Sequence, residues 1–143
     1  MLFLLYCLMM LWLLLLRRIP AGAGMVQLNL QPLDTIKRYL WVLRYSTEPI
    51  QRRYAVANLL GNVGLFLPLG MFLPILFEKT KKPGRFILCA VTTILMVELC
   101  QMLTGLGACD VDDLILNTIG AVAGWGLWKS IQILNGKKTE EST

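Results

Sequence analysis

The sequence of 143 residues contains no histidine, few charged residues and only four cysteines. Charged residues make up 16% of the chain, against roughly 25% of an average soluble domain. Without histidine, the chain lacks the commonest general base and transition-metal ligand. Cys7, Cys89, Cys100 and Cys109 are far apart and form no CxxC pair, so neither a zinc site nor a disulfide framework is indicated.

The residues that are present are mostly apolar, with 56% hydrophobic residues and a mean hydropathy of +0.61. This composition indicates an integral membrane protein, and the length leaves room for one bundle of about four transmembrane helices. The net charge of +5 comes largely from residues that flank apolar runs, which favours membrane anchoring over nucleic-acid binding. The predicted fold class is therefore all-α, a polytopic integral membrane helical bundle.

The first apolar run covers residues 1–16 and is followed by Arg17 and Arg18. A helix of that length reaches about 24 Å, slightly less than the thickness of a bilayer's hydrocarbon core. We predict a retained first transmembrane helix. The alternative is a cleaved signal peptide, because Ala21-Gly22-Ala23 resembles the small-residue processing site of such peptides.

Residues 17–54 are the one long connection and are predicted to form an extracytoplasmic loop. After Pro32, apolar residues recur every three or four positions, which predicts an amphipathic helix over 33–46. Its apolar positions are Leu33, Ile36, Leu40 and Leu43, accompanied by Tyr39, Trp41 and Tyr45. This mixture of aromatic, apolar and basic residues is typical of a helix that lies in the membrane interface.

Three further transmembrane helices are predicted at 55–77, 86–106 and 111–134, and together they form the core of the chain. Residues 135–143 are predicted to be a polar cytoplasmic tail without regular structure. The short turn after the second span is basic, with Lys79, Lys81, Lys82 and Arg85. By the positive-inside rule, this turn and Lys129, Lys137 and Lys138 mark the cytoplasmic face. The loop 17–54 also carries seven basic residues, and we attribute several of them to the interfacial helix.

The last predicted span begins with a cluster of acids, which is out of place in an apolar chain. Ionisable groups at the membrane edge are costly, and a functional site is their default interpretation. At about 100° per residue, Asp110, Asp113, Asn117, Gly120 and Gly124 form one continuous stripe. Polar and small residues on one face are typical of a helix surface turned toward other helices. We predict Gly61, Gly120 and Gly124 as helix-packing positions.

Polar side chains from three spans fall at the same level of an up-and-down bundle. They belong to the start of the second span, the closing half of the third and the start of the fourth. These candidate pocket residues are Asn58, Asn62, Glu98, Gln101, Asp110, Asp112, Asp113 and Asn117. The opposite level is apolar and is closed by the basic turn. The sequence therefore predicts one polar pocket that opens outward.

Each of these residues also has a structural interpretation. Asp110 is a candidate N-cap of the last span, with Asp113 as the acid in its first turn. Asp113 and Asn117 are candidates for interhelical hydrogen bonds with Asn58 or Asn62. For Glu98 the functional interpretation is favoured, because a carboxylate inside a membrane needs a partner, a proton or water.

The chain resembles the VanZ-like family over roughly residues 28–126. The first matching block is Asn58-x-x-Gly61-Asn62-x-x-x-Phe66-x-Pro68-Leu69-Gly70-x-x-x-Pro74. It is followed by Glu98-x-x-Gln101 and then by Asp110-x-Asp112-Asp113-x-x-x-Asn117-x-x-Gly120-x-x-x-Gly124. Upstream, Asn29-Leu30-x-Pro32 is similar to the family's loop after its first helix. Two departures are Ala108, where many members carry arginine, and Leu33, where an aromatic residue often follows the proline.

This resemblance implies a small polytopic membrane protein of the bacterial plasma membrane, whose family includes a member associated with low-level resistance to the glycopeptide teicoplanin. Three functions stay open. In the first, the pocket binds an amphiphilic ligand, either a lipoglycopeptide or an envelope lipid. In the second, Asp110, Asp112, Asp113 and Glu98 hold Mg²⁺ or Ca²⁺ and act on a phosphate-linked lipid. In the third, Glu98 couples protons in a small transporter, which with four spans would need to be a homo-oligomer. Ligand binding ranks first, and no resident cofactor is predicted.

Overall fold

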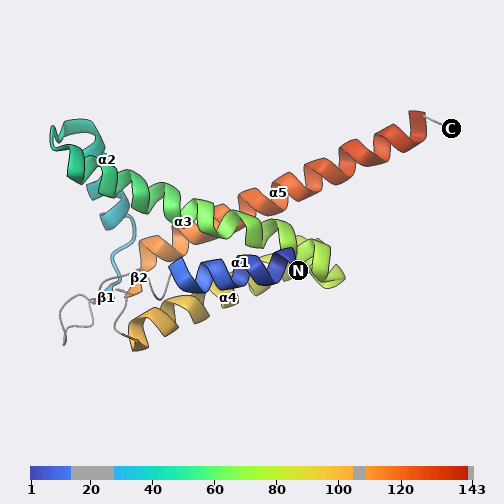
Figure 1. The fold of residues 1–143 in the computed structure, drawn as a ribbon, viewed down its shortest axis with the longest axis horizontal. Helices are drawn as coiled ribbons and strands as arrows, with labels where there is room; N and C mark the ends of the chain where they lie inside the picture. Colours follow the sequence, from blue (N-terminus) through green and yellow to red (C-terminus); the bar gives the residue numbers. More distant parts are fainter. Residues whose placement is uncertain (14–27, 105–108, 142–143) are drawn as a thin grey trace.

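The computed structural model describes residues 1–13, 28–104 and 109–141, with the backbone alone for residues 28, 109 and 136–141. The helices in these residues are α1 (Leu2–Leu11), α2 (Asp34–Tyr45), α3 (Pro49–Leu76), α4 (Pro83–Leu103) and α5 (Val111–Glu141), with a short 3-10 helix η2 (Glu78–Lys81) between α3 and α4. The predicted all-α class is confirmed (Figure 1). A two-residue parallel pair, β1 (Leu28–Asn29) with β2 (Cys109–Asp110), is the one addition in the described residues.

Two of the described helices, α3 and α4, are long and apolar enough to cross a membrane. Each begins with a proline at its first position, where the missing N–H would have no partner in the helix anyway. The described part of α1 is apolar but covers only 10 residues, and the rest of the predicted span 1–16 extends beyond the described residues. The candidate processing site at Ala21-Gly22-Ala23 also lies outside them.

Two helices extend beyond the segments that we predicted. Helix α3 begins at Pro49, before the start of the predicted span 55–77, because Ile50 to Tyr54 continue the helix after the proline. Helix α5 reaches Glu141, so residues 135–141 are helical where we expected a tail without regular structure. Continuity with the preceding turns outweighs the polar composition of that segment.

Helices α3 and α5 run in the same direction and cross at glycine residues. A Cβ atom at Gly120 would lie 2.1 Å from the Val63 carbonyl oxygen, and one at Gly124 would lie 1.9 Å from the Leu67 carbonyl oxygen. From α3, a Cβ at Gly70 would lie 1.9 Å from the Ala121 carbonyl oxygen. No side chain fits between the backbones here, so glycine is what permits this approach.

Gly61, the third predicted packing position, does not lie at this contact. A Cβ atom there would meet nothing within 4 Å among the described residues. The reason is its place on the helix: Gly61 lies two residues before Val63, about 200° around α3 from it, so it does not share the face that meets α5. Gly70 takes the role that we had assigned to Gly61.

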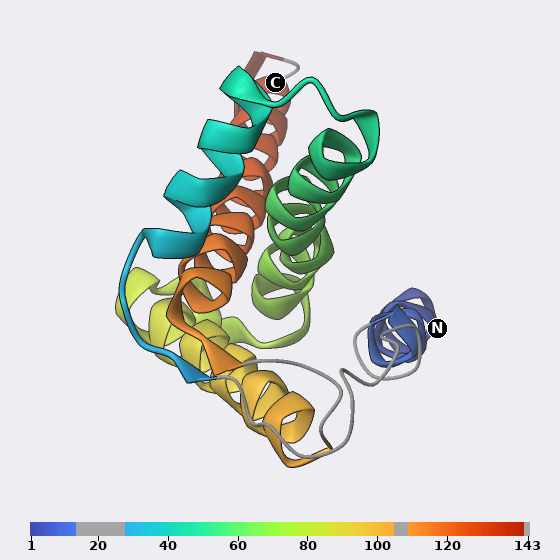
Figure 2. The ribbon, with the colours of Figure 1, turned by 90° about the vertical axis from the view of Figure 1, so that its left-hand side faces the viewer.

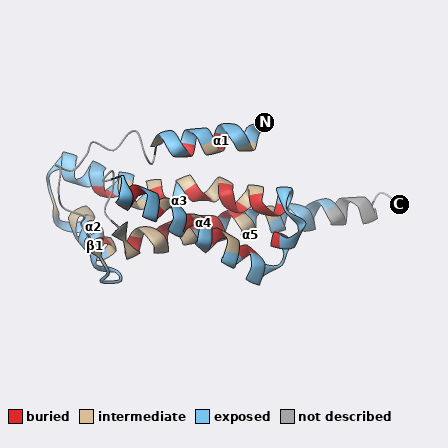
Figure 3. Ribbon diagram, turned by 90° about the horizontal axis from the view of Figure 1, so that it is seen from below, coloured by how far each residue is buried: buried red, intermediate tan, exposed pale blue. Residues whose placement is uncertain are grey.

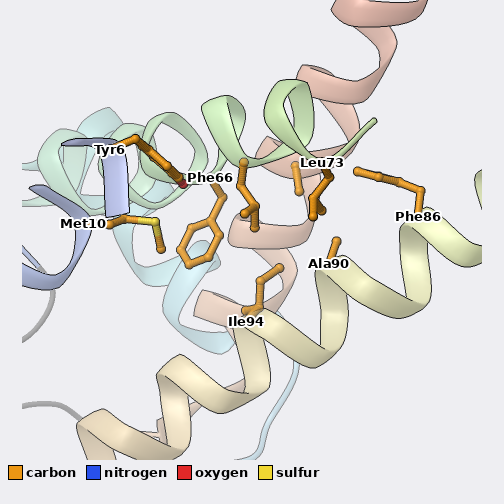
Figure 4. Packing of buried hydrophobic residues seen from close by; sticks show 9 residues of the cluster. Tyr6, Met10, Phe66, Leu73, Phe86, Ala90 and Ile94 are labelled. Carbon is orange, nitrogen blue, oxygen red and sulfur yellow. The ribbon is translucent and has the colours of Figure 1, made fainter. Parts of the chain in front are cut away.

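The apolar core lies between α3, α4 and α5, with α1 packed against its edge. Its buried residues include Phe66 and Leu73 of α3 and Phe86, Ala90 and Ile94 of α4 (Figure 4). Tyr6 of α1 donates a hydrogen bond to the Leu65 carbonyl oxygen at 2.8 Å. Viewed along the molecule, α2, α3 and α5 lie side by side, α4 crosses beneath them and α1 stands to one side (Figure 2). Buried residues follow the inner faces of α3, α4 and α5, while α1 is largely exposed (Figure 3).

Candidate functional site

The acidic start of α5 meets the loop that precedes α2. In the parallel pair of β1 and β2, Asn29 lies opposite Asp110. The side-chain amide of Asn29 donates to the two carboxylate oxygens of Asp110 at 3.3 and 3.2 Å, and the Thr35 hydroxyl donates to Oδ2 at 2.7 Å. Asp110 Oδ1 also accepts the backbone N–H of Asp112 at 2.9 Å. Asp110 therefore holds the first turn of α5 in the manner of an N-cap and joins it to β1 and α2.

Asp112 is fully buried and caps a different helix. Its Oδ1 accepts the backbone N–H of Leu33 at 2.5 Å and its Oδ2 accepts that of Ile36 at 3.0 Å. Helix α2 has no side-chain cap of its own, so the carboxylate of α5 satisfies two amides that its first turn leaves open. Leu33 has a φ of 68°, a left-handed conformation that costs a non-glycine residue about 1–2 kcal/mol. The two hydrogen bonds hold this turn in place.

Asp113 connects α5 to α3 and lies near α2. The side-chain amide of Asn62, itself buried, donates to Asp113 Oδ1. In α2, burial raises the pKa of Tyr39 from 10.0 to about 12, with smaller contributions in the same direction from Tyr54 and from the negative charge of Asp113. The rings of Tyr39 and Tyr54 are 6.1 Å apart. Asp113 is half-buried, whereas Asp112 is fully buried.

Deeper in the bundle, α4 and α5 share a pair of buried polar side chains. Glu98 is 4% exposed and Asn117 is 2% exposed. The Asn117 side-chain amide donates to Glu98 Oε1 at 3.2 Å. Gln101, one turn further along α4, is 1% exposed. A buried carboxyl group in a largely apolar span is costly, so its presence favours a role in packing specificity or in function.

The predicted site residues thus fall into separate groups of contacts. Asp113 with Asn62 and Glu98 with Asn117 are interhelical pairs, while Asp110 and Asp112 bind the loop and helix that precede α3. Asn58 joins neither group, because its side chain donates to the Tyr54 carbonyl oxygen of its own helix at 2.9 Å. In the part of the chain that the structure describes, no three Asp, Glu, Cys or His side chains gather into a group that could hold a metal ion. The four carboxylates proposed as Mg²⁺ or Ca²⁺ ligands therefore do not form one ligand set here.

The hydrogen-bond partners of Asp110 and Asp112 were not predicted from the sequence. Thr35 is buried, donates to Asp110 and accepts from the Arg38 guanidinium at 3.1 Å. Asn29 belongs to a motif that we had noted, although its contact with Asp110 spans 81 residues. For Thr35 and Arg38 the sequence offers no signal, because neither helical periodicity nor a recognised motif singles them out.

Comparison with known proteins agrees with these observations. The chain is 31% identical to "Protein VanZ" of Enterococcus faecium over 84 residues, which are 58% of this chain and 52% of that protein. The match therefore spans about half the length of this curated relative. No solved structure matches the chain significantly. The VanZ/LLP1 family model matches residues 3–134, almost the whole of the described core. The resemblance seen in the polar motifs is thereby confirmed, and the chain belongs to the VanZ/LLP1 family.

Proposed function

We propose that this chain is a multi-pass protein of the bacterial plasma membrane that binds an amphiphilic envelope ligand and so gives low-level tolerance of teicoplanin. The ligand is either the lipoglycopeptide itself or an envelope lipid. Membership of the VanZ/LLP1 family and the two candidate spans α3 and α4 support the membrane location. We also propose the number of spans, the orientation in the membrane and the ligand.

A third deeply embedded helix is supported by the packing of α5 on α3. The two helices are parallel and touch from Val63 and Gly120 to Gly70 and Trp125. That stretch of α5 therefore shares the depth of the middle of α3, a candidate span. With α1 as the first helix, four spans result, and the acids of α5 lie near one membrane surface.

The distribution of charge supports the orientation. The Trp125 indole donates to the Thr80 carbonyl oxygen at 3.3 Å, and the Lys129 ammonium lies 5.2 Å from the Trp125 ring centre. Lys129 is therefore at the same end as the basic residues of η2. Because positively charged turns remain in the cytoplasm, we place this end inside and the polar end, with β1, β2 and the start of α5, outside.

One observation carries the ligand proposal: α3, α4 and α5 each contribute buried polar side chains to the same end of an apolar bundle. These side chains are paired across helices, as Asn62 with Asp113 and Asn117 with Glu98. Asp113, which is half-buried, is the carboxylate that we assign to recognition of the ligand headgroup. Exposed apolar residues of α4, such as Met96 and Leu103, suit an acyl chain. An amphiphile matches both surfaces at once.

Teicoplanin susceptibility of a sensitive bacterium tests this function. The strain would express the wild type, Glu98→Leu or Asp113→Asn at matched membrane levels, with vancomycin measured in parallel. Glu78→Gln is the matched control, because Glu78 is exposed on η2 and bonds to Lys81 at 2.9 Å. We expect the wild type and Glu78→Gln to raise the tolerated teicoplanin concentration, and the two cluster variants to lose that gain. Equal susceptibility of all strains, including the empty host, would refute the proposal.

A further inference from the structure

The buried amide of Asn117 lacks one hydrogen bond. Its nitrogen donates to Glu98 Oε1 at 3.2 Å. Its oxygen is buried and accepts no hydrogen bond from the described residues. A side-chain oxygen that is removed from water without a donor is destabilising, and buried polar atoms in folded proteins are nearly always paired. The site therefore calls for a proton donor next to Asn117 Oδ1.

Exchanging the oxygen and nitrogen positions of the Asn117 side-chain amide does not remove the need for a proton donor. In the opposite orientation the Asn117 oxygen would face Glu98 Oε1, and two oxygen atoms at that separation need a proton between them. In both orientations the missing donor lies beside the carboxyl group of Glu98. Oxygen and nitrogen positions of an amide are assigned from such hydrogen-bond requirements, so this conclusion does not depend on the assignment.

We infer that Glu98 is held as a neutral carboxylic acid, whose hydroxyl supplies the hydrogen bond that Asn117 Oδ1 lacks. An amide and a carboxylic acid are complementary along one edge, because N–H donates to C=O and O–H donates to the amide oxygen. The contact from Asn117 to Glu98 Oε1 is one half of that pair. The structure thus assigns a proton-binding site between α4 and α5.

The position of Glu98 favours the same state. Glu98 lies within the apolar part of α4, where a carboxylate would be costly. On α5, the acids Asp112 and Asp113 precede Asn117 by one to two turns, while the first basic residue, Lys129, follows it by about three turns. Along α5, negative charges therefore lie nearer to the pair than positive ones, which disfavours a further negative charge on Glu98.

Protonation changes what the cluster offers a ligand. A neutral acid paired with an amide presents no charge to bind a metal ion, and it can exchange hydrogen-bond partners with an incoming polar group. This inference does not depend on the teicoplanin proposal, because it concerns the state of the purified protein alone.

Infrared spectroscopy tests it directly. The full chain would be purified in an alkyl maltoside detergent, which contains no carbonyl group, and its carboxylic-acid C=O band would be recorded at neutral pH in H₂O and D₂O. We expect a band that shifts in D₂O and that is absent from Glu98→Gln. In Asn117→Leu the band should move to higher frequency, because the hydrogen bond to the amide is lost.

Glu78→Gln is again the control. Hydrogen bonding to Lys81 lowers the pKa of Glu78, so this residue is ionised at neutral pH and its replacement should leave the band unchanged. Absence of the band in a folded wild-type protein, or its persistence in Glu98→Gln, would overturn the inference. An unchanged frequency in Asn117→Leu would overturn the assignment of Asn117 as the acceptor. Circular dichroism of each variant verifies that the helices are intact.

Discussion

The carboxylate of Asp112 accepts the backbone N–H of Leu33 at 2.5 Å, across 79 residues of sequence. With its second bond, to the N–H of Ile36, it acts as the cap that α2 does not supply for itself. The start of α5 thereby fixes where α2 begins. Because Leu33 has a left-handed backbone conformation, the turn before α2 depends on this external support.

Replacing Asp112 by asparagine should destabilise the protein. The new amide group can accept only one of the two backbone N–H groups, and the other would be buried without a partner. We expect the free energy of unfolding to fall by about 1–3 kcal/mol. Denaturant unfolding in detergent, followed by tryptophan fluorescence, measures it. Faster hydrogen exchange at the amides of Leu33 and Ile36 would locate the effect.

Asp34→Asn is the matched control for that change. Asp34 lies in the first turn of the same helix, but its carboxylate is exposed and only 3.8 Å from Arg38. Exposed ion pairs and first-turn acids contribute under about 1 kcal/mol. If Asp34→Asn were as destabilising as Asp112→Asn, capping by Asp112 would not be the cause.

The glycine contacts between α3 and α5 give a second pair of variants. In Gly124→Ala, the new Cβ would lie 1.9 Å from the Leu67 carbonyl oxygen, so the helices must separate. Overpacking of this kind costs about 1–3 kcal/mol. Gly61→Ala meets no atom within 4 Å and should stabilise the protein by up to about 1 kcal/mol, because alanine is the better helix former. Unfolding free energies of the two variants should therefore change in opposite directions. A loss of stability in both would contradict the packing.

The main helices could be predicted from the sequence because they depend on local signals. The apolar runs predict α3 and α4, and the small residues Gly120 and Gly124 mark the buried face of α5. The common level of Asn62, Glu98 and Asn117 also follows from the alternation of span directions. Each of these inferences needs only spacing along one helix or the order of helices.

The partners of the acids could not be predicted in this way. Asp110 and Asp112 bind groups about 80 residues away, including backbone amides, which carry no sequence signal at all. The amphipathic pattern of α2 also gave no sign that Thr35 is buried while Leu40 is 54% exposed. Helical periodicity finds an apolar face, but it does not show whether that face meets protein or lipid. Asn58 is half-buried, yet its side chain donates to the Tyr54 carbonyl oxygen of its own helix. Which partner it takes depends on its side-chain conformation, which the sequence does not show.

The raised pKa of Tyr39 should make the free energy of unfolding depend on pH in the alkaline range. Its pKa is raised mainly by burial, from 10.0 to about 12, so the folded state favours the neutral phenol. The resulting stabilisation is fully present below pH 10 and is lost as the pH rises toward about 12. Tyr39→Phe should reduce the fall in unfolding free energy over that interval. Tyr45→Phe, at an exposed position of the same helix, is the control, and equal slopes for the two variants would contradict the prediction.

The orientation can be tested at Cys109. The backbone of β2 lies at the end of α4 opposite to the basic turn (Figure 1), and α4 is about 30 Å long at 1.5 Å per residue. A chain that retains only this cysteine requires serine at Cys7, Cys89 and Cys100. If the basic turn is cytoplasmic, a membrane-impermeant maleimide should label Cys109 on intact cells. A matched chain with Lys79→Cys in place of Cys109 should be labelled only in inverted vesicles. The reverse pattern would place the acidic end of α5 in the cytoplasm, where a ligand that approaches from outside the cell could not reach Asp113 without crossing the bilayer.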